Sequence, residues 1–306
     1  NCAQEGLNAP VLCLQSSAYQ RDTKRDPKQF ISGHRRSNCK SLKLSDKRIS
    51  HRTTRQRHRQ WRGTVHAQCT RGARLVHNSF YRHISPMCGR MAITLPHDAM
   101  AQMFAASPSN DLPDVPNYNV CPTTQVGVVT SSEGMRRLRP MRWGFVPHWY
   151  DKPNGGPLLI NARSETIAEK PAFREACRAR RCLVAVSGFY EWERGDKDKP
   201  LPWYVTRSDG EPMVFGGIWQ DWGQGEDALT SFAIVTTGAN AAMGKIHHRL
   251  PVILAPDQWL LWLGEDGKGA ARLMKSAPED TLTFTRVGTA VNSNKASGET
   301  LISPLN

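Results

Sequence analysis

The sequence predicts an α+β fold with a largely antiparallel or mixed, barrel-like β-sheet core and flanking helices in a single domain. Two observations carry this prediction. Many short apolar segments are joined by turns, with only a few helical segments between them, which is typical of α+β proteins with barrel-like sheets. Strict alternation of strand and helix patterns is missing, which argues against a doubly wound parallel sheet.

The expected strands are short runs in which valine and other apolar residues alternate or cluster. They cover residues 87–95, 125–130, 135–143, 181–186, 202–206, 213–219, 231–236 and 282–287. Helical spacing predicts helices over residues 97–106, 170–180, 240–245, 256–263 and 270–276. Residues 113–118 and 147–158 are expected loops, the second because it is rich in proline and glycine.

Residues 1–86 have a composition unlike the rest of the chain. They hold 18 Lys and Arg residues but only 4 Asp and Glu residues, which accounts for the whole net charge of +14. Only 14 of these 86 residues are Leu, Ile, Val or Phe, below the roughly 20% typical of folded chains. We therefore predict a disordered basic leader over 1–86 and one folded domain over 87–306. The chain starts with Asn1, so a fragment, a processed chain or an over-extended reading frame would each explain the leader; we favour the last, with Met87 as the working start.

Several classes of protein are excluded by the composition of the sequence. No run approaches the ~18–20 apolar residues of a membrane span. The cysteines of the folded part have neither C-x-x-C nor zinc-ligand spacing, so we expect reduced thiols in a cytosolic compartment, no metal, and core positions for Cys177 and Cys182. Nucleotide-binding and hydrolase motifs are missing, so no cofactor is expected. Residues 87–306 hold 23 basic and 23 acidic residues, so nucleic acid would need a local basic face.

Four residues are candidates for chemistry, and each has a plainer interpretation. Cys88 in Met-Cys-Gly-Arg could be a nucleophile or a core thiol. Glu191 lies between aromatic residues that would desolvate it and raise its pKa, as a proton-transferring carboxylate needs, but it could equally pair with an arginine. His247, in His-His-Arg-Leu-Pro, could be a turn residue, and Asn161, in Ile-Asn-Ala-Arg, a cap or turn former.

Six motifs in a fixed order, taken together, favour the chemical interpretation of these residues over the structural one. They are Met87–Arg90 (MCGR), Tyr118–Pro122 (YNVCP), Trp143–Phe145 (WGF), Ile160–Thr166 (INARSET), Gly188–Trp192 (GFYEW) and Ile246–Pro251 (IHHRLP). In this combination the sequence resembles the SOS-response-associated peptidase family, whose members process abasic sites. The resemblance covers residues 87–306 and leaves out the leader.

The resemblance implies a role for each matching residue. Cys88 would be the nucleophile once Met87 and the leader are absent, and its catalytic partners would be Asn161, Glu191, His247 and Thr236. The implied DNA contacts are Arg90, Arg163, Arg249, Trp143 and the loop that starts at Pro147. The implied partner is single-stranded DNA with abasic sites, including junctions with duplex. We expect a monomer without cofactor, metal or membrane contact, located in the cytoplasm at the nucleoid, or in the nucleus of a eukaryote.

The chemistry explains why an N-terminal cysteine suits this substrate. A ring-opened abasic site carries an aldehyde, and the amine of an N-terminal cysteine forms a Schiff base that the thiol then closes to a thiazolidine ring. The α-amino group has an ordinary pKa of about 7.7–8.0, so part of it is unprotonated at neutral pH. The Schiff base also makes weak AP-lyase activity possible.

The printed chain conflicts with this chemistry at one bond. While Met87 precedes Cys88, the cysteine nitrogen is an amide and cannot form an imine. Translation from Met87 followed by Met removal, or autoproteolysis between Met87 and Cys88, would release the amine; otherwise the long form is inactive. A cysteine autopeptidase and a non-covalent single-stranded DNA binding module are the alternative functions.

Overall fold

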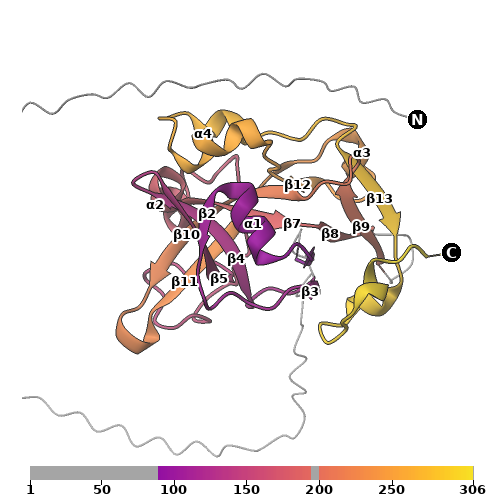
Figure 1. The fold of residues 1–306 in the computed structure, drawn as a ribbon, viewed down its shortest axis with the longest axis horizontal. Helices are drawn as coiled ribbons and strands as arrows, with labels where there is room; N and C mark the ends of the chain where they lie inside the picture. The colour runs from indigo at the N-terminus through magenta and orange to yellow at the C-terminus, as the bar shows by residue number, and fades with distance from the viewer. Residues whose placement is uncertain (1–88, 194–199, 306) are drawn as a thin grey trace, which may run out of the picture. The chain divides into compact units, whose positions relative to one another are not determined.

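A computed structural model of the chain describes residues 89–193 and 200–305. The leader predicted over 1–86 and the candidate nucleophile Cys88 lie outside the described residues. The structure therefore bears on the predicted folded domain from Gly89 onward (Figure 1).

The described strands form two sheets. One has five strands, all paired antiparallel, in the order β13 (Leu282–Arg286), β9 (Leu201–Arg207), β8 (Gly188–Glu193), β1 (Met91–Ile93) and β3 (Asn117–Val120). The second follows the order β12 (Arg249–Pro251), β11 (Leu229–Gly238), β10 (Met213–Trp222), β7 (Arg181–Val186), β4 (Gln125–Ser132), β5 (Met135–Trp143) and β2 (Ala106–Pro108), and β6 (Asn161–Arg163) pairs with β11. Most neighbours are antiparallel; the parallel pairs are β11 with β5, β11 with β6, and β2 with β5.

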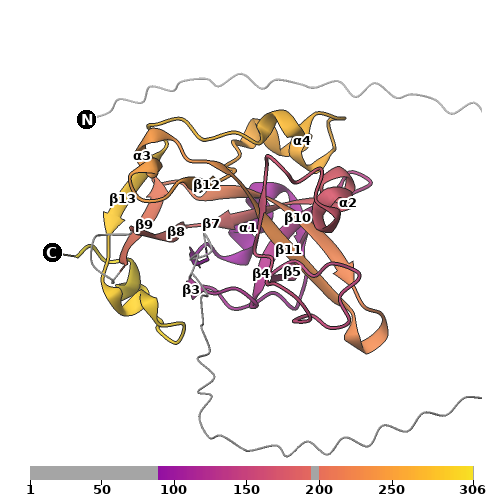
Figure 2. The ribbon, with the colours of Figure 1, turned by 180° about the vertical axis from the view of Figure 1, so that it is seen from behind.

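One pairing makes the second sheet barrel-like. Ser231 and Phe232 of β11 pair in parallel with Arg142 and Trp143 of β5, although β10, β7 and β4 lie between these strands along the sheet. The sheet therefore curves back on itself, and the α+β, barrel-like prediction is confirmed (Figures 1 and 2). The β4–β5 hairpin inside it closes through a two-residue turn at Glu133 and Gly134, both with positive φ (52° and 75°), as tight hairpins require.

The two sheets are joined where β7 runs directly into β8. Only Ser187 separates the strands, and its N–H donates to Ala92 O (2.9 Å). Gly188 follows because a Cβ there would lie 2.3 Å from the Tyr204 ring. This junction matters for the site because it carries the chain from the barrel core to Glu191.

Four short helices pack against the sheets in the described part of the chain. They are α1 (His97–Phe104), α2 (Pro171–Ala179), α3 (Ala241–Gly244) and α4 (Trp259–Leu263). Helix α1 packs on β2 and β5, α2 on β7 and β10, and α4 on β7 (Figure 2). Among the described residues, no helix is long and apolar enough to cross a membrane.

Several expected boundaries were wrong. The helix expected over residues 270–276 is a 3-10 turn at Ala270–Leu273, and the one expected over 256–263 begins with another at Pro256–Gln258. Strand β3 covers part of the loop expected over 113–118, and β2 and β6 were not predicted as strands. These strands are three or four residues long and partly polar, so they lack the apolar alternation that identifies a strand.

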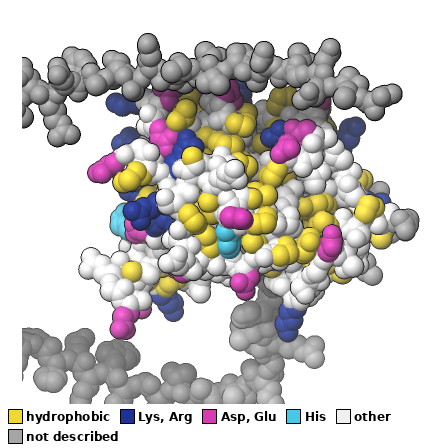
Figure 3. Space-filling view, viewed as in Figure 1, with side chains coloured by type: hydrophobic (Ala, Val, Ile, Leu, Met, Phe, Trp, Pro, Cys, Tyr) yellow, Lys and Arg dark blue, Asp and Glu magenta, His cyan; other side chains and the backbone are white. Residues whose placement is uncertain are grey.

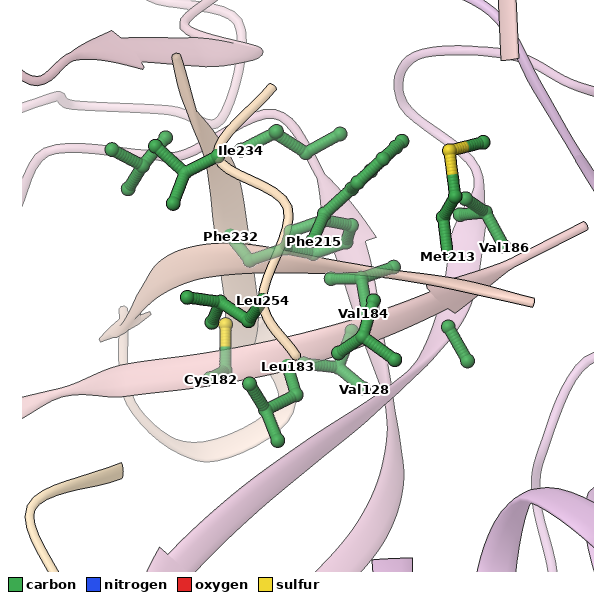
Figure 4. Close-up of a cluster of buried hydrophobic side chains, with 14 of the residues drawn as sticks. Val128, Cys182, Leu183, Val184, Val186, Met213, Phe215, Phe232, Ile234 and Leu254 are labelled. Carbon is green, nitrogen blue, oxygen red and sulfur yellow. The ribbon is translucent and has the colours of Figure 1, made fainter. Parts of the chain in front are cut away.

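The main core is built largely from the strands of the second sheet and its helices, and buried residues of the first sheet such as Phe189 and Val205 join it. Val184 of β7, Phe215 of β10 and Phe232 of β11 are fully buried there (Figure 4). Cys182 is also buried in this cluster, and burial raises the pKa of its thiol. The core position predicted for Cys182 is confirmed; Cys177 is half-buried and packs against the same core.

Candidate active site

Three neighbouring strands bring together residues that lie far apart in the sequence. Strand β11 is in the middle, and its Thr236 pairs with Arg163 of β6 on one side and Pro251 of β12 on the other. Asn161 begins β6 opposite Ile234, and His247 stands two residues before β12. Asn161 and Thr236 therefore lie on adjacent strands of one sheet, and His247 lies just before the strand on the other side of β11.

The His247 ring is fixed by the chain on both sides of it. Its backbone N–H donates to Met243 O (2.9 Å) at the end of α3, which Asn240 caps. The backbone N–H of Arg249 donates to His247 Nδ1 (3.1 Å). Nδ1 must be without a proton to accept this bond, so the neutral ring carries its proton on Nε2. The side chain is 9% exposed and presents Nε2–H as its donor.

Arg249 is held by protein groups. Its Nη1 and Nη2 donate to the two carboxylate oxygens of Glu165 (2.6 and 2.9 Å), and Nη2 also donates to Thr236 O (2.7 Å). This hydrogen bond to Arg249 holds the pKa of Glu165 below its usual range, so the ion pair is lost only as the pH falls through that lowered value. In this conformation the guanidinium is paired with a carboxylate, and a phosphate would have to compete for it.

Replacing Glu165 by glutamine should raise the affinity for undamaged single-stranded DNA about two- to threefold, because it releases Arg249 for phosphate. Fluorescence anisotropy at two salt concentrations measures this. Glu169→Gln is the matched control, since it removes an exposed charge from the same segment. An equal gain in both variants would show that net charge, and not Arg249, is responsible.

Glu191 belongs to the other sheet and lies next to the start of the described chain. Met91 of β1 pairs with Phe189 of β8, and the N–H of Tyr190 donates to Arg90 O (2.9 Å). Continuing this antiparallel register places Gly89 opposite Glu191. The Glu191 side chain is only 1% exposed. Gly89, which follows the candidate nucleophile in the sequence, therefore lies opposite a residue with a buried carboxylate.

Three of the four predicted catalytic partners have contacts beyond those given above. Asn161, Glu191 and His247 each take part in at least one further noncovalent interaction. The His247 ring also lies 4.4 Å from the His248 ring, centroid to centroid. These contacts hold polar side chains in place in a largely buried environment.

Arg90 anchors the strand that follows Cys88. Its Nη1 donates to Asn119 Oδ1 (2.6 Å) and Val291 O (2.7 Å), and its Nη2 donates to Asn294 Oδ1 (2.5 Å). The side chain is buried and its carbon Cζ lies 5.8 Å from the centroid of Trp192. Arg90 thus ties β1 to β3 and to the C-terminal segment, and its terminal nitrogens are bonded to protein instead of facing a phosphate.

The structure corrects the DNA contacts predicted at the end of β5. Trp143 is fully buried, and its Nε1–H donates to Ile160 O (3.1 Å), so its indole cannot lie against DNA. Pro147 is buried as well. In the same loop Trp149 is 48% exposed, and Leu158 is 49% exposed. Trp149 and Leu158 are therefore the large apolar side chains that this loop exposes.

Sequence reasoning missed one feature of the site. A pocket of about 480 Å³ opens beside Gly89 and Arg90, and its walls include Pro122 and Trp192. Both residues belong to motifs quoted above, Tyr118–Pro122 and Gly188–Trp192. The sequence motifs therefore contained residues of the pocket walls, but nothing in the sequence shows that the two motifs lie side by side in the fold.

Charge is dispersed on the face of the molecule that Figure 3 shows. In the space-filling view, Lys and Arg side chains are scattered among acidic and apolar ones instead of forming one broad basic patch (Figure 3). Arg163 of β6 is exposed and is the predicted phosphate contact most open to solvent. Within residues 89–193 and 200–305, no group of three His, Cys, Asp or Glu side chains could hold a metal ion.

Comparison with known proteins decides the family. The model of the SOS response associated peptidase (SRAP) family matches residues 87–294. This chain belongs to the SRAP family. The matched part of the SRAP chain includes Asn161, Glu191, Thr236 and His247.

Similar proteins are found in bacteria and vertebrates. YoqW of Bacillus subtilis is 31% identical over 223 residues, which cover 71% of this chain and 99% of YoqW. YedK of Escherichia coli is 31% identical over 227 residues, covering 72% and 100% of the two chains. HMCES of Pongo abelii is 28% identical over 272 residues, covering 72% and 76%. Each of the three is named an abasic site processing protein.

Solved structures agree on the fold of the SRAP chain. A crystal structure of a protein from Bacteroides thetaiotaomicron aligns with a TM-score of 0.63 at 22% identity, covering 72% of this chain and 100% of that one. A phage-related protein from Bordetella bronchiseptica aligns with a TM-score of 0.54 at 26% identity, covering 65% and 94%.

Proposed function

We propose that this SRAP protein captures abasic sites in single-stranded DNA, including sites at junctions with duplex, by forming a thiazolidine between Cys88 and the sugar aldehyde. One observation carries the proposal: the β1–β8 register sets Gly89, the neighbour of Cys88, opposite the buried carboxylate of Glu191. The names of the relatives, abasic site processing proteins, support the choice of substrate.

The reaction joins both heteroatoms of the cysteine to one carbon. The Cys88 amine adds to the C1′ aldehyde and gives a carbinolamine, which loses water to form an imine. The thiol then adds across the C=N bond; sulfur bonds to C1′, and the thiol proton passes to nitrogen. The net change is loss of one water, so no oxidant or cofactor is needed. The intermediate imine acidifies the neighbouring sugar C–H, which would give weak AP-lyase activity as a side reaction.

The neighbouring side chains are suited to move the protons of these steps. Glu191 accepts a proton from the amine or thiol, because a carboxylate shielded from water is an effective base. The Nε2–H of His247 donates to the sugar oxygen as the ring opens. Asn161 orients the amine or a sugar hydroxyl, and Thr236 supports it from the next strand.

Exposed side chains would contact the DNA strand in this proposal. Exposed Arg163 offers a phosphate contact, and Trp149 and Leu158 offer apolar surface for an unstacked base. Release of the Cys88 amine, by initiation at Met87 or by cleavage of the Met87–Cys88 bond, is a precondition. Autoproteolysis would use the same thiol, so it is compatible with the main proposal.

A chain beginning at Cys88 should form a denaturation-resistant adduct with a single-stranded oligonucleotide that contains one abasic site. Gel electrophoresis after denaturation detects it. Strands with a tetrahydrofuran analogue, which lacks the aldehyde, or with no lesion should give no adduct, and Cys88→Ala should abolish it. Equal binding of all three strands without an adduct would contradict the proposal and favour a non-covalent DNA-binding module.

Replacing His247 by alanine should slow adduct formation about a hundredfold, the usual scale for loss of a proton-transferring group. Time courses under single-turnover conditions measure the rate. His248→Ala is the matched control, since it removes the adjacent imidazole but leaves the Nδ1 contact of His247 intact, and its rate should stay within about threefold. Equal loss in both variants would remove His247 from the mechanism.

A further inference from the structure

The pocket beside Gly89 has features that the capture of an aldehyde does not use. It holds about 480 Å³, and its walls include Arg90, Pro122, Trp192, Asn292 and Asn294. Asn292 ends the 3-10 turn Thr289–Asn292, and Asn294 follows two residues later. The pocket is thus built from four regions of the chain, and it adjoins Gly89, the residue that follows Cys88 in the sequence.

The orientation of both asparagine amides is dictated by their partners. Trp192 Nε1–H donates to Asn292 Oδ1 (2.6 Å), and Arg90 Nη2 donates to Asn294 Oδ1 (2.5 Å). Indole and guanidinium nitrogens only donate, so each asparagine must turn its oxygen toward them. Within the described part of the chain, neither Nδ2 donates a hydrogen bond. Two amide NH₂ groups at the pocket are therefore available as donors.

The aromatic wall is held in place. Arg90 Cζ lies 5.8 Å from the Trp192 ring centroid, and the Trp192 Nε1 bond to Asn292 fixes the ring from its edge. An immobilised indole is a good stacking platform for a base, because little side-chain freedom is lost on binding. Pro122 adds a second apolar wall.

We propose that this pocket is a nucleobase subsite that favours guanine over adenine at a position flanking the abasic sugar. Guanine presents two acceptors, N7 and O6, on one edge, whereas adenine has an amino donor in place of O6. That amino group would meet an amide donor whose own oxygen is already bonded. The proposal rests on the proposed function, which places the abasic sugar at Cys88, next to Gly89.

The test compares strands that differ in one base. Oligonucleotides with one abasic site carry guanine or adenine immediately 5′ or 3′ to it, and the initial rate of adduct formation is measured below saturation. The same four strands with tetrahydrofuran in place of the abasic site are used for equilibrium binding. On one side of the lesion guanine should be favoured roughly fivefold or more in both measurements. Differences below twofold on both sides would overturn the inference.

A double variant, Asn292→Asp with Asn294→Asp, sharpens the test. Each aspartate keeps an oxygen for Trp192 or Arg90 but loses the NH₂ donors, so the preference should invert toward adenine. Ser297→Asp is the charge control: it adds a carboxylate at an exposed position of the same segment and should weaken binding while keeping the guanine preference. Unfolding midpoints verify that the variants fold; an unchanged preference in a folded double variant would contradict the proposal.

The two readouts separate this inference from the proposed function. If adducts form equally well beside guanine and adenine, the subsite is wrong and the capture of abasic sites stands. If no strand forms an adduct, the proposed function is wrong, and the tetrahydrofuran strands still decide whether the pocket distinguishes the bases.

Discussion

A chain that begins at Cys88 should form the abasic-site adduct at least about a hundredfold faster than the 306-residue chain with its Met87–Cys88 bond intact. The α-amine, with an ordinary pKa of about 7.7–8.0, is partly unprotonated at neutral pH and attacks an aldehyde. The nitrogen of Cys88 in the long chain is an amide, which has no available lone pair for this step. Single-turnover time courses with both proteins measure the ratio.

Two controls define what the free amine contributes. A chain that retains Met87 as its first residue has a free amine, but not on the cysteine, and should behave like the long chain. Intact mass before and after incubation shows whether the long chain cleaves itself, and Cys88→Ser should block that cleavage. Equal rates for an uncleaved long chain and the chain that begins at Cys88 would contradict the aminothiol chemistry.

Replacing Trp143 by alanine should lower the free energy of unfolding by about 3–5 kcal/mol, the usual cost of truncating a large buried aromatic side chain. The indole is fully buried and bonded to Ile160 O, the carbonyl just before Asn161. Urea unfolding followed by circular dichroism measures the change.

Trp149→Ala is the matched control for this prediction. Its side chain is 48% exposed, so stability should change by less than about 0.5 kcal/mol, while affinity for single-stranded DNA should fall about five- to tenfold through lost stacking. If Trp143→Ala instead left stability unchanged and weakened DNA binding, the buried position of its indole would be wrong.

The fold could be predicted largely because its long strands can be recognised from the local sequence. Strands β5 and β7 both have the bounds expected from the sequence: β7 is an apolar run, and β5 follows directly after the turn at Glu133 and Gly134. The short strands were harder to predict. Strand β6 has three residues, Asn161–Arg163, and is defined by pairing with β11, some 70 residues later in the chain; such pairing leaves no local periodicity.

The sequence could name candidate site residues but could not show how they are arranged. The family resemblance implied Asn161, Thr236 and His247; in the structure Asn161 and Thr236 lie on adjacent strands, and His247 lies two residues before the next strand, β12. Sequence could not show that Arg249 is paired with Glu165, or that Trp143 points into the core. An arginine or tryptophan in such a motif could either contact DNA or stabilise the fold. Only its partners in the three-dimensional structure distinguish these two roles.

The central claim is that Cys88 binds the abasic sugar through both its nitrogen and its sulfur. Mass spectrometry of the denatured adduct, treated with borohydride and then iodoacetamide, tests it most directly. We expect a mass equal to protein plus DNA minus one water, unchanged by borohydride, with the Cys88 peptide not alkylated. A gain of two hydrogens, an alkylated Cys88, or an attachment at any other residue would contradict the thiazolidine.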